Sequence, residues 1–129
     1  MPYSLPPAIE DIAKLGDRAL AAIPAKLREQ VRGVSIIVED AADDETVAEL
    51  GLENAWELTG VYRGIPFGRA ESAVPHAPDM IVLYREPILL EWIETGEDLF
   101  RLVRTVLIHE IAHHFGFSDD DIEALEAED

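Results

Sequence analysis

Polar side chains interrupt an otherwise apolar segment at residues 105–122, TVLIHEIAHHFGFSDDDI. His109 and His113 are four residues apart, so on a helix they lie one turn apart on the same face. Two imidazoles placed in this way can bind one cation at Zn–N distances of about 2.0–2.1 Å. Glu110 is one residue round from His109, where its carboxylate can hold and deprotonate a water molecule without being a ligand. The pattern predicts a zinc site with a general base beside it.

A third ligand is needed, because two side chains are too few for zinc. Gly116 is suited to end the helix and turn the chain back. Asp119 follows six residues after His113, and the segment reads H-E-x-x-H-x-x-G-x-x-D. The fourth position is then left for water, as catalytic zinc sites require. We therefore expect a three-ligand site made of His109, His113 and Asp119.

Structural roles are the alternative explanation for each of these residues. The two histidines could be satisfied core side chains, and residues 119–121 could simply favour the positive end of a following helix. Asp120 is the alternative third ligand. We interpret His114 as a half-buried packing residue, because helical geometry turns it about 100° away from His113. His76 lies in a polar loop without a recognisable partner.

The composition excludes several other kinds of protein. The 129 residues contain no cysteine, which excludes disulfides, a catalytic thiol and a thiolate metal site. Hydrophobic residues make up 48% of the chain, so we expect one folded domain over residues 1–129, with about 123–129 frayed. The chain shows neither a signal-peptide pattern nor an apolar run long enough to cross a bilayer. We expect a cytoplasmic protein.

The charge balance limits the partners. Ten Lys and Arg face 27 Asp and Glu, which gives a formal net charge of −17. Such a charge repels phosphate, so we expect neither a nucleic-acid nor a membrane partner. A neutral or basic peptide is a better partner. The same charge can also serve only to keep the protein soluble and monomeric, and we expect a monomer.

The order of hydrophobic patterns and turn residues is mixed and predicts an α+β fold. The expected helices are 7–30 (interrupted at Pro24), 43–51 and 86–94, and the expected strands are 34–40, 58–67 and 80–85, with a loop at 68–79. Thr95 with Asp98 suggests a capping box that opens a long, mostly buried helix ending at Gly116. Ser118 with Asp121 suggests a second capping box, which opens a last acidic helix.

At these residues the sequence resembles the minimal zincin-like metallopeptidases of bacteria, small single-domain proteins with HExxHxxGxxD. The resemblance extends to GVYRGIP (60–66), IVLYREPIL (81–89) and VLIHEIAHHFGFSDDDI (106–122). It implies a zincin fold, in which a small mixed sheet lies beside a long metal-binding helix and an edge strand borders the peptide cleft. It implies the same three zinc ligands and Glu110 as the base. The chain differs from larger relatives in having Asp as the third ligand and no later Met or Tyr.

We therefore expect a zinc-dependent peptidase in which Glu110 takes a proton from water and delivers it to the leaving amine. Only ten residues follow Asp119, so we expect a shallow cleft and weak cleavage of short or unfolded peptides. One alternative is a zinc-bound, catalytically weak or inactive peptide-binding module of the same fold, which would not need Glu110. Another is a metal-dependent ribonuclease with HGxxHxxGxxxH, which the glutamate at position 110 and the negative charge disfavour.

Overall fold

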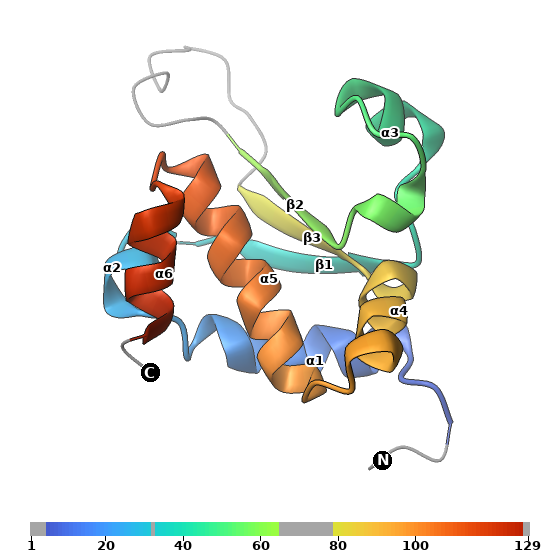
Figure 1. Ribbon diagram of the computed structural model, residues 1–129, viewed down its shortest axis with the longest axis horizontal. Helices are drawn as coiled ribbons and strands as arrows, with labels where there is room; N and C mark the ends of the chain where they lie inside the picture. Colours follow the sequence, from blue (N-terminus) through green and yellow to red (C-terminus); the bar gives the residue numbers. More distant parts are fainter. Residues whose placement is uncertain (1–4, 32, 65–78, 128–129) are drawn as a thin grey trace.

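A three-stranded mixed sheet with helices on both faces forms the centre of the structure (Figure 1). The computed structural model describes residues 5–31, 33–64 and 79–127. The helices are α1 (Ile9–Leu20), α2 (Ala25–Arg28), α3 (Asp44–Glu49), the 3-10 helix η1 (Ala55–Glu57), α4 (Arg85–Thr95), α5 (Leu99–His114) and α6 (Asp119–Ala127). The strands are β1 (Ser35–Glu39), β2 (Gly60–Arg63) and β3 (Met80–Tyr84). The expected α+β class is confirmed. None of the helices in the described ranges is both long and apolar enough to span a membrane.

The central strand of the sheet is β3, and the strand order is β1-β3-β2. β1 runs parallel to β3, and β2 runs antiparallel to it, with Gly60 opposite Leu83 and Tyr62 opposite Ile81. Side chains alternate across a strand. Ile81 and Leu83 accordingly join the main core, whereas Val82 lies in a smaller cluster on the other face. This burial on both faces explains the continuous apolar sequence of β3.

Helix α5 supplies much of the main core. Its buried residues are Leu99, Leu102, Val103, Val106, Leu107, Ile108, Ile111 and Ala112. Strand β2 comes very close to this helix at Gly60, where an added Cβ would lie 2.9 Å from Val106 Cγ1 and 3.2 Å from the Val82 carbonyl oxygen. Only glycine allows this approach. It brings the edge strand against the helix that carries the histidines.

The start of α5 differs from the prediction. Asp98 is itself the N-cap and accepts a hydrogen bond from the Arg101 backbone N–H at 3.1 Å. Thr95 belongs to the end of α4, where its hydroxyl donates to the Glu91 carbonyl oxygen at 2.8 Å. Gly96, with φ of 69°, separates the two helices. The Thr95–Asp98 capping box is therefore wrong, because a left-handed turn intervenes between its members.

The bounds of α2 and α6 can be compared with those expected from the sequence. Pro24 precedes α2 as its N-cap residue, as expected for a break in the first helical segment. Helix α6 continues through Ala127, where a frayed end was expected from residue 123. Leu125 is only 4% exposed, and this burial accounts for the extra helical turns.

Most of the predicted loop, including His76, lies outside the described residues.

Replacing Gly60 by Ala should destabilise the protein by about 1–3 kcal/mol, because the new methyl group overpacks the contact between β2 and α5. Combining it with Val106→Ala should recover part of this loss, since one of the two clashing groups is removed. Chemical denaturation of both single variants and the double variant measures the coupling. Strictly additive effects would contradict the close approach.

Candidate metal centre

The C-terminal end of α5 is closed by backbone hydrogen bonds around a left-handed glycine. Gly116 has φ of 81°, a conformation that L side chains rarely adopt. The Phe117 N–H donates to the Ala112 carbonyl oxygen at 2.9 Å, and the Gly116 N–H donates to that of His113 at 3.2 Å. These bonds satisfy the last carbonyls of the helix. The chain then turns back toward the face that carries the histidines, as predicted from Gly116.

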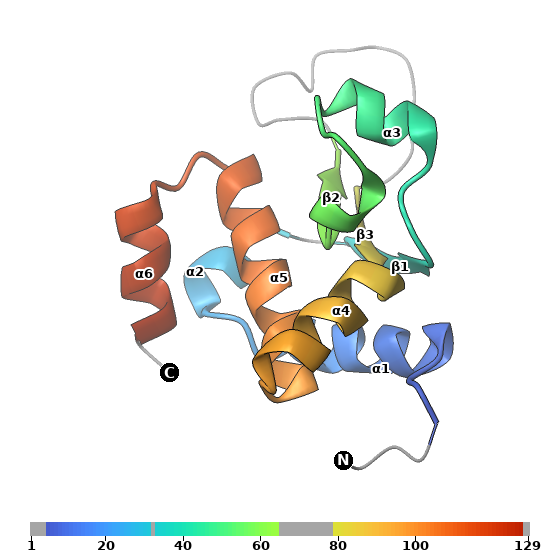
Figure 2. The same ribbon diagram turned by 45° about the vertical axis from the view of Figure 1, so that its right-hand side comes forward.

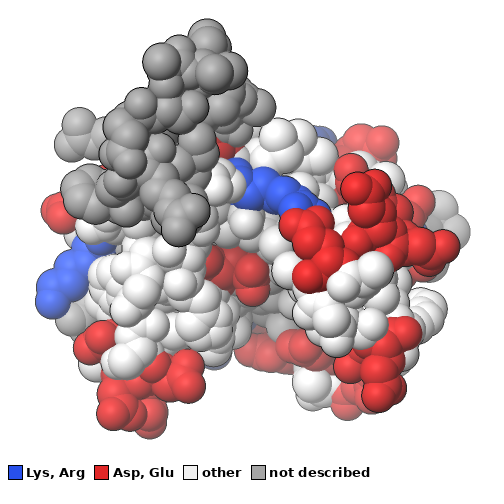
Figure 3. Space-filling model, turned by 90° about the horizontal axis from the view of Figure 1, so that it is seen from above, with Lys and Arg blue, Asp and Glu red and all other residues white. Residues whose placement is uncertain are grey.

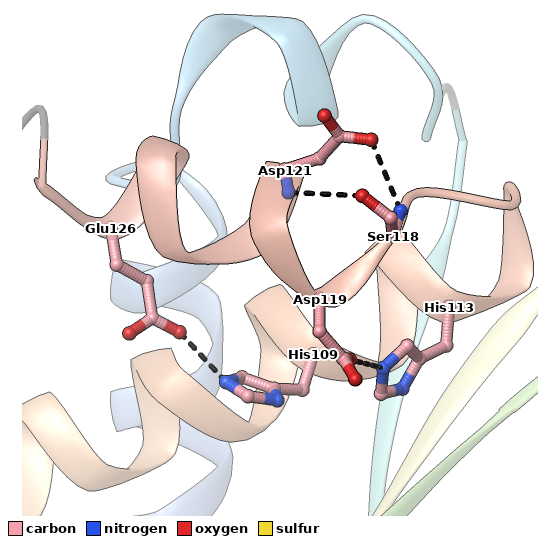
Figure 4. Close-up of polar contacts among 6 residues, drawn as sticks. All are labelled: His109, His113, Ser118, Asp119, Asp121 and Glu126. Atoms are coloured by element: carbon pink, nitrogen blue, oxygen red, sulfur yellow. Dashed lines mark hydrogen bonds and ion pairs between the residues drawn. The ribbon is translucent and has the colours of Figure 1, made fainter.

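Helix α6 opens with the predicted capping box. The Asp121 N–H donates to Ser118 Oγ at 3.1 Å, and the Ser118 N–H donates to Asp121 Oδ2 at 3.1 Å (Figure 4). These bonds fix the first turn of α6, which contains Asp119. Both ribbon views place α6 beside α5 (Figures 1 and 2). The box therefore presents Asp119 to the end of the histidine helix.

His113 and Asp119 face one another. His113 Nε2 lies 3.4 Å from Asp119 Oδ1, which is longer than an ordinary hydrogen bond. Two atoms bound to zinc at 2.0–2.1 Å and at the tetrahedral angle are about 3.3 Å apart. The pair thus has the spacing of two ligands that share one ion. This contact favours Asp119 over Asp120 as the carboxylate ligand.

His109 is directed elsewhere. Its Nε2 atom lies 2.7 Å from Glu126 Oε1, and Figure 4 shows the ring pointing toward that carboxylate. The ring centroids of His109 and His113 are 5.9 Å apart and nearly perpendicular. Among the described residues, no group of three or more His, Asp or Glu converges on a point that could hold a metal ion. The structure brings His113 to Asp119, and it pairs His109 with Glu126 instead.

Glu110 lies partly buried between α5 and the edge strand. Burial raises the pKa of its carboxyl group above the usual value, while His113, the backbone N–H of Tyr62 and His109 each oppose that rise. The carboxyl group therefore lies near the Tyr62 backbone in β2. A carboxyl group with a raised pKa is a better proton acceptor near neutral pH. The position of Glu110 suits a general base.

Tyr62 ties the edge strand to the end of α5. Its ring stacks on His114 with centroids 3.9 Å apart, and its hydroxyl donates to Asp79 Oδ2 at 2.7 Å. Burial and the Asp79 hydrogen bond raise the pKa of Tyr62. His114 is half-buried, as predicted, and burial lowers its pKa although Asp79 opposes the change. Its Nε2 atom is buried without a hydrogen-bond partner among the described residues. Tyr84, on β3, is a core side chain.

Sequence reasoning missed the role of Glu126. The residue lies seven positions after Asp119, which on a helix is two turns along the same face. A helix that directs Asp119 toward His113 therefore directs Glu126 toward the same side of α5. This signal was available, but it depended on the helix continuing well past residue 123.

The chain belongs to the zincin-like metallopeptidase family, whose family model matches residues 31–128. The small sheet beside a long helix fits this assignment. Among solved structures, the chain is similar to a conserved hypothetical protein from Thermo thermophilus. The two share 26% identity with a TM-score of 0.52, and the match covers 95% of this chain and 100% of the other. No curated protein matches the chain.

In the metal-free protein, Glu110→Gln should raise stability at neutral pH. Burial raises the pKa of Glu110 above its unfolded value, so the favourable contribution of the protonated form is complete below about pH 4.5 and is lost as pH rises through the folded pKa. Glutamine stays neutral throughout. Melting temperatures in excess chelator should therefore differ at pH 7 and converge near pH 4. The exposed Glu123→Gln is the control, and an equal gain in both variants would contradict the burial argument.

Proposed function

We propose that this protein is a zinc-dependent peptidase that hydrolyses short or unfolded peptides. The proposed ligands are His109, His113 and Asp119, and the proposed general base is Glu110. The 3.4 Å spacing of His113 Nε2 and Asp119 Oδ1, one turn from Glu110, is the observation that carries the proposal. Membership of a family described as zincin-like metallopeptidases supports it.

The donor set suits zinc. Two imidazole nitrogens and one carboxylate oxygen, with a fourth position left open, form the common arrangement of catalytic zinc sites. A bound zinc ion would supply Lewis acidity, polarising a peptide carbonyl and lowering the pKa of water toward 7. His109 has to turn away from Glu126 to join the other two ligands.

The chain itself moves the proton. The Glu110 carboxylate accepts a proton from the water that attacks the peptide carbonyl carbon, and it delivers that proton to the leaving amine nitrogen.

The substrate would be an extended peptide beside β2. This strand pairs with β3 on one side and is the last strand in the described order. An added strand reads backbone groups more than side chains, which suits unfolded peptides of varied sequence. Acidic side chains form most of the charged surface in Figure 3. With a net charge of −17, we expect neutral or basic peptides to be cleaved faster than acidic ones.

The third ligand can be tested with two neighbouring aspartates. Asp119→Ala should weaken zinc binding strongly, since it removes one of three ligands, whereas Asp120→Ala should bind like the wild type. The matched pair removes the same charge from adjacent positions of α6. Competition with a chromogenic chelator measures both affinities. If only the Asp120 variant lost zinc, Asp120 would be the third ligand and the assignment to Asp119 would be wrong.

Removal of the base should separate binding from chemistry. Glu110→Gln should retain zinc and lose about 10²–10⁴ in the rate of peptide cleavage, because the amide cannot accept the water proton. The assay uses an unstructured peptide library with the zinc-loaded proteins and a chelator control. Equal activity of wild type and variant would point to another source of cleavage. If the zinc-loaded wild type cleaves no peptide, the protein is better described as a peptide-binding module.

A further inference from the structure

The contact between His109 and Glu126 uses the atom that a metal would need. An ionised carboxylate only accepts hydrogen bonds. In this contact the N–H group at His109 Nε2 is therefore the hydrogen-bond donor, and Glu126 Oε1, at 2.7 Å, is the acceptor. A metal ligand must instead offer a lone pair. His113 presents its Nε2 atom to Asp119, and His109, one turn earlier on the same face, would reach a shared ion with the same atom. One nitrogen cannot serve both purposes at once.

The His109–Glu126 contact is shorter than the His113–Asp119 contact, and this difference separates a hydrogen bond from a pair of metal ligands. Atoms that share a tetrahedral zinc ion are about 3.3 Å apart. The 3.4 Å separation of His113 and Asp119 meets that condition, but the 2.7 Å separation of His109 and Glu126 is that of a direct hydrogen bond. The geometry therefore does not place Glu126 as a further ligand of the same ion.

We infer that Glu126 is a positioning residue that competes with the metal for His109, and that it holds this histidine away from the site until metal binds. The inference rests on the proposed zinc site. It makes α6 contribute both a ligand, Asp119, and a competitor, Glu126, from positions two turns apart. The affinity for zinc is then set partly by the strength of a contact that has to break.

The position of Glu126 in α6 explains why it needs His109. It lies in the last turn of the helix, where the negative end of the helix dipole disfavours a carboxylate. That turn contains no basic residue. The hydrogen bond from His109 compensates for this placement. Both side chains are partly exposed, at 43% and 37%, so the contact is weak enough to exchange.

The structure has space beside Glu126 into which its carboxylate can move. Glu126 lines a hollow of about 970 Å³. The other charged residues that line it are Glu97, Asp98, Arg101 and Arg104, and Thr105 lies beside them. Thr105 lies one helical turn before His109, so the hollow borders the contact. When the His109 ring turns toward His113, the carboxylate can move into this space.

The competition between Glu126 and zinc can be tested by whether removing Glu126 strengthens or weakens zinc binding. Glu126→Ala should bind zinc about three- to tenfold more tightly than Glu123→Ala, because a partly exposed contact of ordinary strength no longer has to be broken. The control removes the same charge from an exposed position of the same helix, so it accounts for the general loss of attraction for a cation. Glu126→Gln should lie between them, since its amide oxygen still accepts a hydrogen bond. Competition against a chromogenic chelator at fixed pH and salt measures all three.

A second readout needs no metal. In excess chelator, Glu126→Ala should melt at a lower temperature than Glu123→Ala, because only the former loses the hydrogen bond between His109 on α5 and residue 126 on α6. Weaker zinc binding by Glu126→Ala would overturn the inference, since Glu126 would then be a ligand or a support for His109. Equal binding by the two alanine variants would overturn it as well. A third variant, His113→Ala, tests the proposed zinc site separately. If this variant binds zinc as tightly as the wild type, the proposed zinc site is wrong, whatever the role of Glu126.

Discussion

Helix α5 has to bury most of its surface and still present polar groups at its C-terminal end, and the rest of the structure is arranged around this requirement. Eight of its sixteen residues are buried. One exposed or partly exposed stripe contains Arg101, Thr105, His109 and His113, each four residues from the next. Helix α6 packs beside this stripe through the buried Ile122 and Leu125.

Two close contacts align the sheet with this helix. Gly60 lets β2 approach α5, and the Tyr62 ring then stacks on His114, while the Tyr62 backbone lies near Glu110. The Tyr62 hydroxyl extends the connection to Asp79, just before β3. Glu110, which we propose as the general base, thus lies in one packed unit with the edge strand and the end of the histidine helix. A substrate strand beside β2 would be placed relative to Glu110 by the same contacts.

Local sequence signals predicted the parts of the site that depend on neighbouring residues. Helical spacing placed His109, Glu110 and His113 on α5, Gly116 ended the helix, and Ser118 with Asp121 formed the expected capping box. The start of α5 was missed, because Thr95 and Asp98 have similar capping chemistry and only the left-handed Gly96 separates their roles.

Contacts between distant segments could not be predicted in the same way. The stack of Tyr62 on His114 joins residues 52 positions apart and depends on the packing of β2 on α5. The contact of Glu126 with His109 depends on the direction that α6 takes after Gly116. A motif therefore predicts the candidate ligands of a metal site, but it does not tell which other residues contact them in the metal-free protein.

The central claim is that zinc draws His109 away from Glu126 and into a site with His113 and Asp119. Anomalous diffraction at the zinc edge, from crystals of the zinc-loaded protein, tests this most directly. The account predicts one peak about 2.0–2.2 Å from His109 Nε2, His113 Nε2 and an Asp119 carboxylate oxygen, with the Glu126 carboxylate moved off the imidazole. A peak ligated by Glu126, or a zinc site that leaves the His109–Glu126 hydrogen bond intact, would contradict it.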